Sequence, residues 1–196
     1  MIDEKFVILA AALIVLGDFS YLVYTIKGKV KPNRVTWLLW GFPALITSAV
    51  QFSQGLGILS LATFAFGIPC FLIFFASFLN KKAYWKITTF DLTCGAVSLI
   101  GLALWSITQV GNWAILLAVV SDGLASVPTI VKSYKAPETE NYQAYLLNGL
   151  GAIVILFTIK QWEFAYSAFP VYILLLNLIL VPLVKFKLGK KIQAYA

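Results

Sequence analysis

The chain has 196 residues, of which 61% are hydrophobic and 12% are charged, and its mean hydropathy is +0.89. This composition is typical of an integral membrane protein and excludes an ordinary soluble domain. With no histidine and two cysteines the chain also excludes a zinc site built from those ligands, and its net charge of +7 follows from membrane topology without a nucleic-acid partner.

Hydrophobic runs long enough to cross a bilayer recur along the chain between clusters of charged residues. They predict seven transmembrane helices, at residues 6–26, 35–52, 56–79, 88–108, 112–131, 142–159 and 164–184. Helices are favoured over barrel strands because the runs are continuous and about twice as long as a barrel strand. The expected fold class is therefore an all-α integral membrane protein with seven transmembrane helices.

The basic residues fall on one side of this arrangement. Of the 15 Lys and Arg residues, all except Lys5 and Lys160 map to the same side. By the positive-inside rule we expect the N-terminus outside, the C-terminus in the cytosol and a location in the plasma (inner) membrane. The first run is expected to be a retained helix, because it lacks the basic segment that precedes the hydrophobic core of a signal peptide.

Two parts of the chain resemble each other. Asp18 corresponds to Asp122 and, after one inserted residue, Trp40 corresponds to Tyr145. Because the matches fall in corresponding helices, we infer an internal duplication. We expect a three-helix repeat at residues 1–83, a linker helix at 84–110, and a second three-helix repeat with a basic cytosolic tail at 111–196. The linker helix makes the two repeats run in parallel, an arrangement known among transporters.

Three features resemble the SWEET and PQ-loop superfamily of membrane transporters: the 3+1+3 helix arrangement, the length, and the segment PTIVKSYK at residues 128–135. Residues 31–40 are also similar to uncharacterised prokaryotic membrane proteins. The resemblance implies a seven-helix solute transporter in which Asn177 matches a pocket asparagine. The chain has Pro128-Thr129 instead of Pro-Gln, and Ala76 instead of the other pocket asparagine, so the resemblance does not imply a sugar specificity.

Asp18 and Asp122 are the first candidates for a functional site. They lie about 18 and 15 Å from the outer edge of their helices, at roughly 1.5 Å per residue. A charge at such a depth costs roughly 2.5–3.5 kcal/mol on insertion scales, and this favours a role in a proton or cation relay or in solute contact. The alternative is a carboxyl group that ties two helices together, helped by the small residues beside it.

Trp40 and Tyr145 lie one turn inside the second and sixth helices. There an aromatic ring can stack on a solute, although an aromatic belt at the interface also explains such residues. The amides of Asn148 and Asn177 can orient a solute or can form hydrogen bonds between helices.

Pro43 and Pro128 lie in the middle of their helices. Proline removes a backbone donor and allows a helix to bend, so these two positions are predicted hinges.

These residues predict a transporter or facilitator of a small polar solute. It would work by alternating access between the two three-helix bundles. In one version of this hypothesis, Asp18 and Asp122 couple the transport to protons. An ion channel lined by the two carboxylates remains an alternative. So does a receptor or scaffold that binds its partner through four charged residues of the cytosolic loops: Lys132, Lys135, Glu138 and Glu140.

Other classes of protein are disfavoured. The seventh helix has no lysine to hold retinal, and the chain shows neither clustered metal ligands nor a nucleophile motif, so we expect no light-driven pump and no enzyme. The expected partners are the lipid bilayer, a small polar solute and, for a coupled carrier, protons. A homo-oligomer is compatible with the sequence, and we expect no nucleic acid, metal or cofactor.

Overall fold

A computed structural model describes residues 2–108 and 111–195. Within these residues the chain forms eight α-helices, two 3-10 helices and no strand. The helices are α1 (Phe6–Ile26), α2 (Arg34–Ser53), α3 (Gly57–Ala76), η1 (Lys81–Ala83), α4 (Thr89–Thr108), α5 (Gly111–Lys135), η2 (Pro137–Thr139), α6 (Tyr142–Thr158), α7 (Phe164–Lys185) and α8 (Leu188–Tyr195). The prediction of an all-helical chain is confirmed. The predicted boundary between linker helix and second repeat includes residue 110, which lies outside the described residues.

The helix ends follow from local sequence. Asn33 and Asn141 precede α2 and α6, and their side chains accept hydrogen bonds from the first backbone N–H groups of these helices. Asparagine is among the best residues for such a cap. Gly28 follows α1 with a φ of 67°, a left-handed conformation that glycine adopts more easily than other residues and that often ends a helix.

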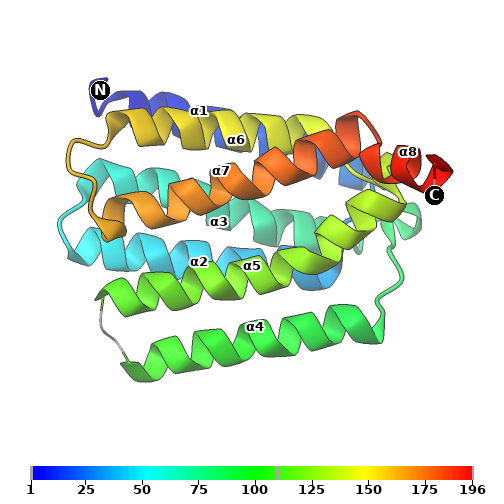
Figure 1. Ribbon diagram of the computed structural model, residues 1–196, viewed down its shortest axis with the longest axis horizontal. Coiled ribbons are helices and arrows are strands. Elements are labelled where there is room, and N and C mark those ends of the chain that lie inside the picture. The colour runs from blue at the N-terminus through cyan, green and yellow to red at the C-terminus, as the bar shows by residue number, and fades with distance from the viewer. Residues whose placement is uncertain (1, 109–110, 196) are drawn as a thin grey trace.

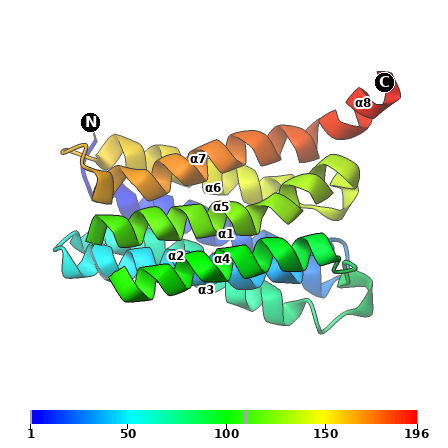
Figure 2. The same ribbon diagram turned by 60° about the horizontal axis from the view of Figure 1, so that its bottom comes forward.

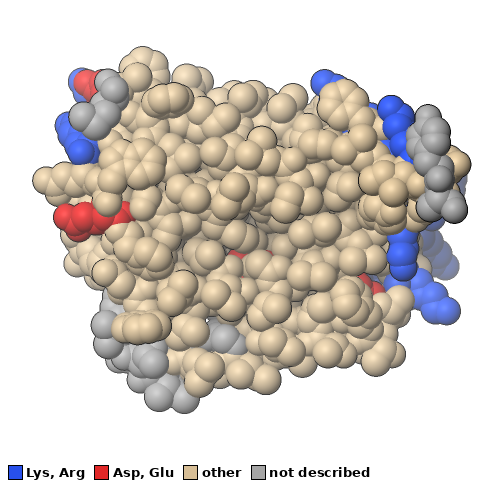
Figure 3. All heavy atoms as spheres, in the orientation of Figure 1, with Lys and Arg blue, Asp and Glu red and all other residues tan. Residues whose placement is uncertain are grey.

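The helices α1 to α7 run side by side and alternate in direction (Figure 1). The N-terminus and the α2–α3 and α6–α7 connections lie at one end. The other end carries α8 and the α1–α2, α3–α4 and α5–α6 connections, and we call it the basic end. Figure 3 shows Lys and Arg gathered there, separated by a broad band of other residues from a smaller group at the opposite end. In that smaller group, Lys160 contacts Glu4 at 3.8 Å.

Within the described residues, five helices are long and apolar enough to cross a membrane: α1, α2, α3, α5 and α7. The outer surface of the bundle is apolar, and Phe19, Phe75 and Leu178 are each about 60% exposed. Large apolar surfaces on long helices of this kind indicate an integral membrane protein. In α4 and α6 the described apolar segments, Thr89–Ile100 and Tyr142–Thr158, are shorter.

The helices pack in a regular order. α3 packs on both α1 and α2, and α7 packs on both α5 and α6. Between these two groups, α1 packs on α6 and α2 packs on α5. This set of contacts maps onto itself when α1, α2 and α3 are exchanged for α5, α6 and α7. The remaining long helix, α4, lies on the outside against α5 and α2 (Figure 2), where the Asn33 amide donates a hydrogen bond to Asp91 of α4 at 2.9 Å.

Small residues allow close contact between α1 and α6. A Cβ atom added at Gly17 would lie 3.0 Å from the carbonyl oxygen of Ala144, and one at Gly151 would lie 2.7 Å from Cγ1 of Ile14. Neither position has room for a side chain without movement of its neighbour. The α1–α6 contact therefore depends on glycine from both helices.

Two hydrophobic clusters fill the interior. One lies toward the N-terminal end and includes Val7, Phe66 and Phe169. The other lies toward the basic end and includes Trp37 and Leu180. Buried polar residues occur where these clusters meet, as Asp18 and Asp122 do, and toward both ends of the bundle.

Candidate functional site

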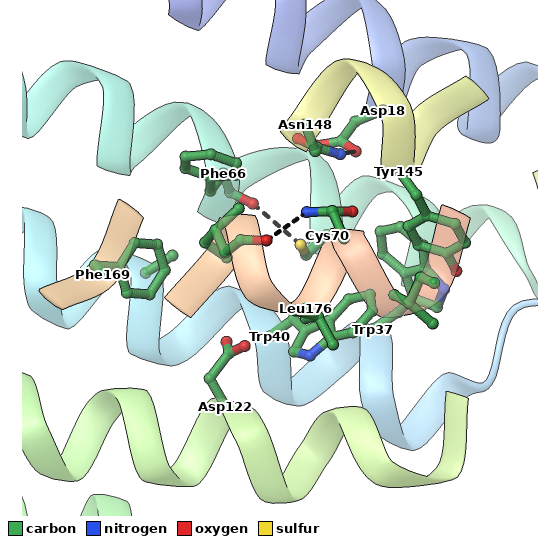
Figure 4. A pocket seen from close by; sticks show the side chains of 14 residues that line it. Asp18, Trp37, Trp40, Phe66, Cys70, Asp122, Tyr145, Asn148, Phe169 and Leu176 are labelled. Carbon is green, nitrogen blue, oxygen red and sulfur yellow. Dashed lines mark hydrogen bonds between the residues drawn. The ribbon is translucent and has the colours of Figure 1, made fainter. Parts of the chain in front are cut away.

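A cavity lies where the two hydrophobic clusters meet, between the two groups of three helices (Figure 4). About 50 Å³ inside it is open to the centres of water-sized molecules. Its lining includes all the residues that the sequence predicted for solute binding or coupling: Asp18, Trp40, Asp122, Tyr145, Asn148 and Asn177. Side chains that are far apart in the sequence, on α1, α2, α5, α6 and α7, therefore meet at one place.

The two aspartates lie on opposite sides of this cavity (Figure 4). Asp18 is 3% exposed, and its Oδ1 accepts a hydrogen bond of 2.7 Å from Nδ2 of Asn148, which joins α1 to α6. Asp122 is 2% exposed, and its Oδ2 accepts a hydrogen bond from the hydroxyl of Tyr172, which joins α5 to α7. Each carboxyl group thus ties two helices together and also faces the shared cavity.

Several polar atoms of the cavity have no partner among the described residues. Nε1 of Trp40 and Oδ1 of Asn148 are buried and unpaired. Each aspartate uses a single oxygen in its hydrogen bond, Oδ1 in Asp18 and Oδ2 in Asp122. Asn177 donates its Nδ2 to the carbonyl of Ile173 within α7. Since buried polar groups are nearly always hydrogen-bonded, these atoms are suited to receive a polar ligand.

A second group of polar residues lies beside the cavity toward the basic end. Glu140 Oε2 accepts hydrogen bonds from the hydroxyls of Tyr21, at 2.7 Å, and Tyr145, at 2.6 Å. Its Oε1 lies 2.6 Å from Nζ of Lys132. Lys132 Nζ also donates to the backbone carbonyl of Lys31. We call Tyr21, Lys132, Glu140 and Tyr145 the basic-end cluster.

The basic-end cluster joins the two groups of three helices. Tyr21 belongs to α1, while Lys132 and Tyr145 belong to α5 and α6. The ring of Tyr21 packs against Trp37 of α2, with ring centroids 4.5 Å apart. Tyr145 lines the cavity and also bonds Glu140, so it connects the cluster to the cavity.

The prediction that four charged loop residues form an exposed docking surface is wrong for two of them. Lys132 is 1% exposed and Glu140 is 7% exposed, because they pair with each other inside the protein. Lys135 and Glu138 are exposed as expected, and Glu138 forms an ion pair of 2.7 Å with Lys190 of α8.

Sequence reasoning also missed Tyr21, although a signal was present. Tyr21 follows Asp18 by three positions in a helix, so both side chains lie on the same face. By the same spacing, Tyr145 and Asn148 share a face of α6.

The two predicted hinge prolines are buried within continuous helices, Pro43 in α2 and Pro128 in α5. Their role in bending remains a prediction.

Searches against protein-family models, curated proteins and solved structures found no match to this chain. The resemblance to the SWEET and PQ-loop superfamily therefore stays a prediction based on the helix arrangement and the segment at residues 128–135. What the protein does must be inferred from the site.

Proposed function

We propose that the protein is a seven-helix membrane transporter or facilitator that carries a small polar solute by alternating access. The observation that supports this most is the cavity lined by Asp18 and Asp122. It lies between two groups of helices, and the six residues predicted for the site, from five helices, all line it. Solute sites of many transporters lie in this position, near the middle of the membrane and between two repeats.

The packing order supports two parallel repeats, α1–α3 and α5–α7, joined by α4. Exchange of the two groups leaves the set of packed helix pairs unchanged, as a two-fold axis along the membrane normal requires. In this proposal α4 and α6 also cross the membrane. α6 has 17 residues, which at about 1.5 Å per residue reach roughly 25 Å, near the lower limit for a crossing helix. The basic end then faces the cytosol.

Alternating access needs a closure at each end of the cavity, and each closure should connect the two repeats. At the basic end this is the basic-end cluster. At the opposite end Nε2 of Gln51 in α2 donates to the carbonyl of Ala165 in α7 at 3.1 Å. Near it the rings of Phe66 and Phe169 pack with centroids 5.9 Å apart. A rocking movement of one repeat against the other would open one closure while the other remains shut.

Asp18 and Asp122 are the residues proposed to couple transport to protons or to contact the solute. A carboxyl group buried in a membrane protein is unfavourable when charged and unpaired, so binding of a proton or a solute at the cavity stabilises it. Pro43 and Pro128 lie in the two helices that form the α2–α5 contact between repeats. They are suited to bend as the repeats rock.

Transport into liposomes tests this proposal. Purified protein is reconstituted with and without a pH gradient and is offered sugars, amino acids, nucleosides and amines. We expect uptake of at least one solute class. The substitutions Asp18→Asn and Asp122→Asn should reduce this uptake, whereas Glu163→Gln, at an exposed residue outside the cavity, should not. Uptake of no solute, or unchanged uptake in both aspartate variants, would contradict the proposal.

A further inference from the structure

The charge of the cavity is one-sided. Asp18 and Asp122 both line it, and no Lys or Arg is found among its described lining residues. The nearby cation, Lys132, is already paired with Glu140 at 2.6 Å. Two carboxylates therefore share a buried space without a positive partner. Buried charges in proteins are paired or neutralised, because an unpaired one is strongly unfavourable.

Aromatic rings form much of the remaining wall. Trp37 and Trp40 line the cavity together with Tyr145 toward the basic end, and Phe66 and Phe169 lie toward the other end (Figure 4). The two tryptophan rings are nearly perpendicular, at 75°, with centroids 5.1 Å apart. Aromatic faces attract cations, tryptophan most strongly, and the attraction grows when the site excludes water.

The unpaired polar atoms of the cavity also favour a ligand with a positive charge. Oδ1 of Asn148 is a buried acceptor without a partner. Asp18 and Asp122 each keep one oxygen that has no hydrogen bond among the described residues. Among the described residues, the buried unpaired donors of the cavity wall are Nε1 of Trp37 and Nε1 of Trp40. These three acceptors outnumber the two donors, which suits a ligand that brings positive charge or N–H groups together with an acceptor such as a hydroxyl.

Other kinds of ligand fit this wall less well. An anion would be repelled by both carboxylates, and a neutral polyol would leave them without a counter-charge. A metal ion requires several oxygen, nitrogen or sulfur ligands, and among the described residues no group of three or more His, Cys, Asp or Glu is placed to hold one. An organic cation uses both the carboxylates and the aromatic rings.

From these observations we propose that the cavity binds a small organic cation, an amine or a quaternary ammonium ion, held between Asp18 and Asp122 and against the rings of Trp40 and its neighbours. That this cation is the transported solute rests on the proposed function, whereas its binding does not.

Paired probes of equal shape separate charge from size. Choline and 3,3-dimethyl-1-butanol differ by the replacement of a quaternary nitrogen with carbon. Binding of choline, tetramethylammonium and ethanolamine to the detergent-purified chain is measured by calorimetry and by the shift in melting temperature. 3,3-Dimethyl-1-butanol serves as the neutral counterpart of choline, and 1-propanol as that of ethanolamine. We expect at least one cation to bind ten-fold or more tightly than its neutral counterpart. If no cation in this series does so, the inference is wrong.

Matched variants test the location. Asp18→Asn, Asp122→Asn and Trp40→Leu should each weaken binding of the cation at least ten-fold, and Asp18→Glu should retain part of it. Trp162→Leu is the control, since Trp162 is 63% exposed and lies outside the cavity. A melting curve of each variant without ligand shows whether it is folded. Cation binding that survives in all folded cavity variants would place the site elsewhere and overturn the inference.

Failure of this inference differs from failure of the proposed function. If choline binds but neither choline nor any other solute of the panel enters liposomes, the cation site stands and transport is refuted. If neutral solutes are transported and no cation competes with them, transport stands and the cation inference is refuted.

Discussion

The basic-end cluster gives the sharpest prediction, through Glu140→Gln. Glutamine can still accept hydrogen bonds from the hydroxyls of Tyr21 and Tyr145, but it cannot neutralise Lys132, whose side chain is 1% exposed. Removing one partner of a buried ion pair typically costs about 3–5 kcal/mol. Because Lys132 keeps its hydrogen bond to the Lys31 carbonyl, we expect the lower part of this range.

If the Lys132 ammonium group reaches water when the basic end opens, the loss of its partner Glu140 destabilises only the closed state. At about 1.4 kcal/mol per factor of ten, a destabilisation of about 3 kcal/mol raises the population of the open state roughly 100-fold. The chain contains its own reporter, because Cys70 lines the cavity and is buried. In a Cys94→Ser background, the rate of labelling of Cys70 by a small maleimide should rise by about this factor.

The double variant Glu140→Gln with Lys132→Met provides the decisive comparison. It leaves no charge buried at this place, so labelling of Cys70 should return toward the original rate. Glu138→Gln is the control, since that carboxylate is exposed and pairs with Lys190 outside the cluster. Unchanged labelling in a folded Glu140→Gln protein, or equally fast labelling in the double variant, would refute the role of the cluster as a closure.

Three further outcomes are expected. In a denaturation assay, Gly17→Ala should lower the free energy of unfolding by about 1–3 kcal/mol, because its Cβ would meet the α6 backbone at 3.0 Å. Gly123→Ala is the control and should be close to neutral, because the nearest contact of its Cβ would be 3.7 Å away. Asn33→Ala should lower the free energy of unfolding by about 1 kcal/mol, because the α2 cap is lost. Since the same amide donates to Asp91, hydrogen exchange should become faster at the start of α4 as well as at the start of α2. The hydrogen bond from Lys190 holds the pKa of the Glu138 carboxyl below its usual value. The contact is therefore present at neutral pH and is lost as the pH falls through that lowered pKa. The protection of α8 amides from hydrogen exchange, expressed relative to the intrinsic exchange rate at each pH, should therefore fall in acid, and this fall should be absent in Glu138→Gln.

The long helices could be predicted because their signal is local. A run of apolar residues between charged clusters identifies a helix without knowledge of its neighbours, and α1 begins and ends where it was expected. That Asp18 and Asp122 line one cavity could be predicted from the sequence for a similar reason. A charge in an apolar helix must face the interior, and two such charges in related positions tend to face the same interior.

The basic-end cluster could not be predicted in this way. Lys132 lies in the last turn of α5 and Glu140 lies in the connection to α6, two places where charged residues usually face water. Their burial depends on contacts with the other helix group, namely the Lys31 carbonyl and Tyr21. The order of packing, with α3 and α7 in the centre of their groups, also depends on contacts between distant segments. Hydrophobicity alone does not distinguish it from other arrangements of the same helices.

Under the proposed duplication, the basic-end cluster shows that the two halves have become unlike. Tyr21 and the Lys31 carbonyl come from the first half, whereas Lys132, Glu140 and Tyr145 come from the second. Two copies of either half could not rebuild this cluster. On this proposal, an ancestor made of identical halves had a different set of contacts at this end, and halves of the present chain, expressed separately, should assemble as unlike pairs and not with themselves.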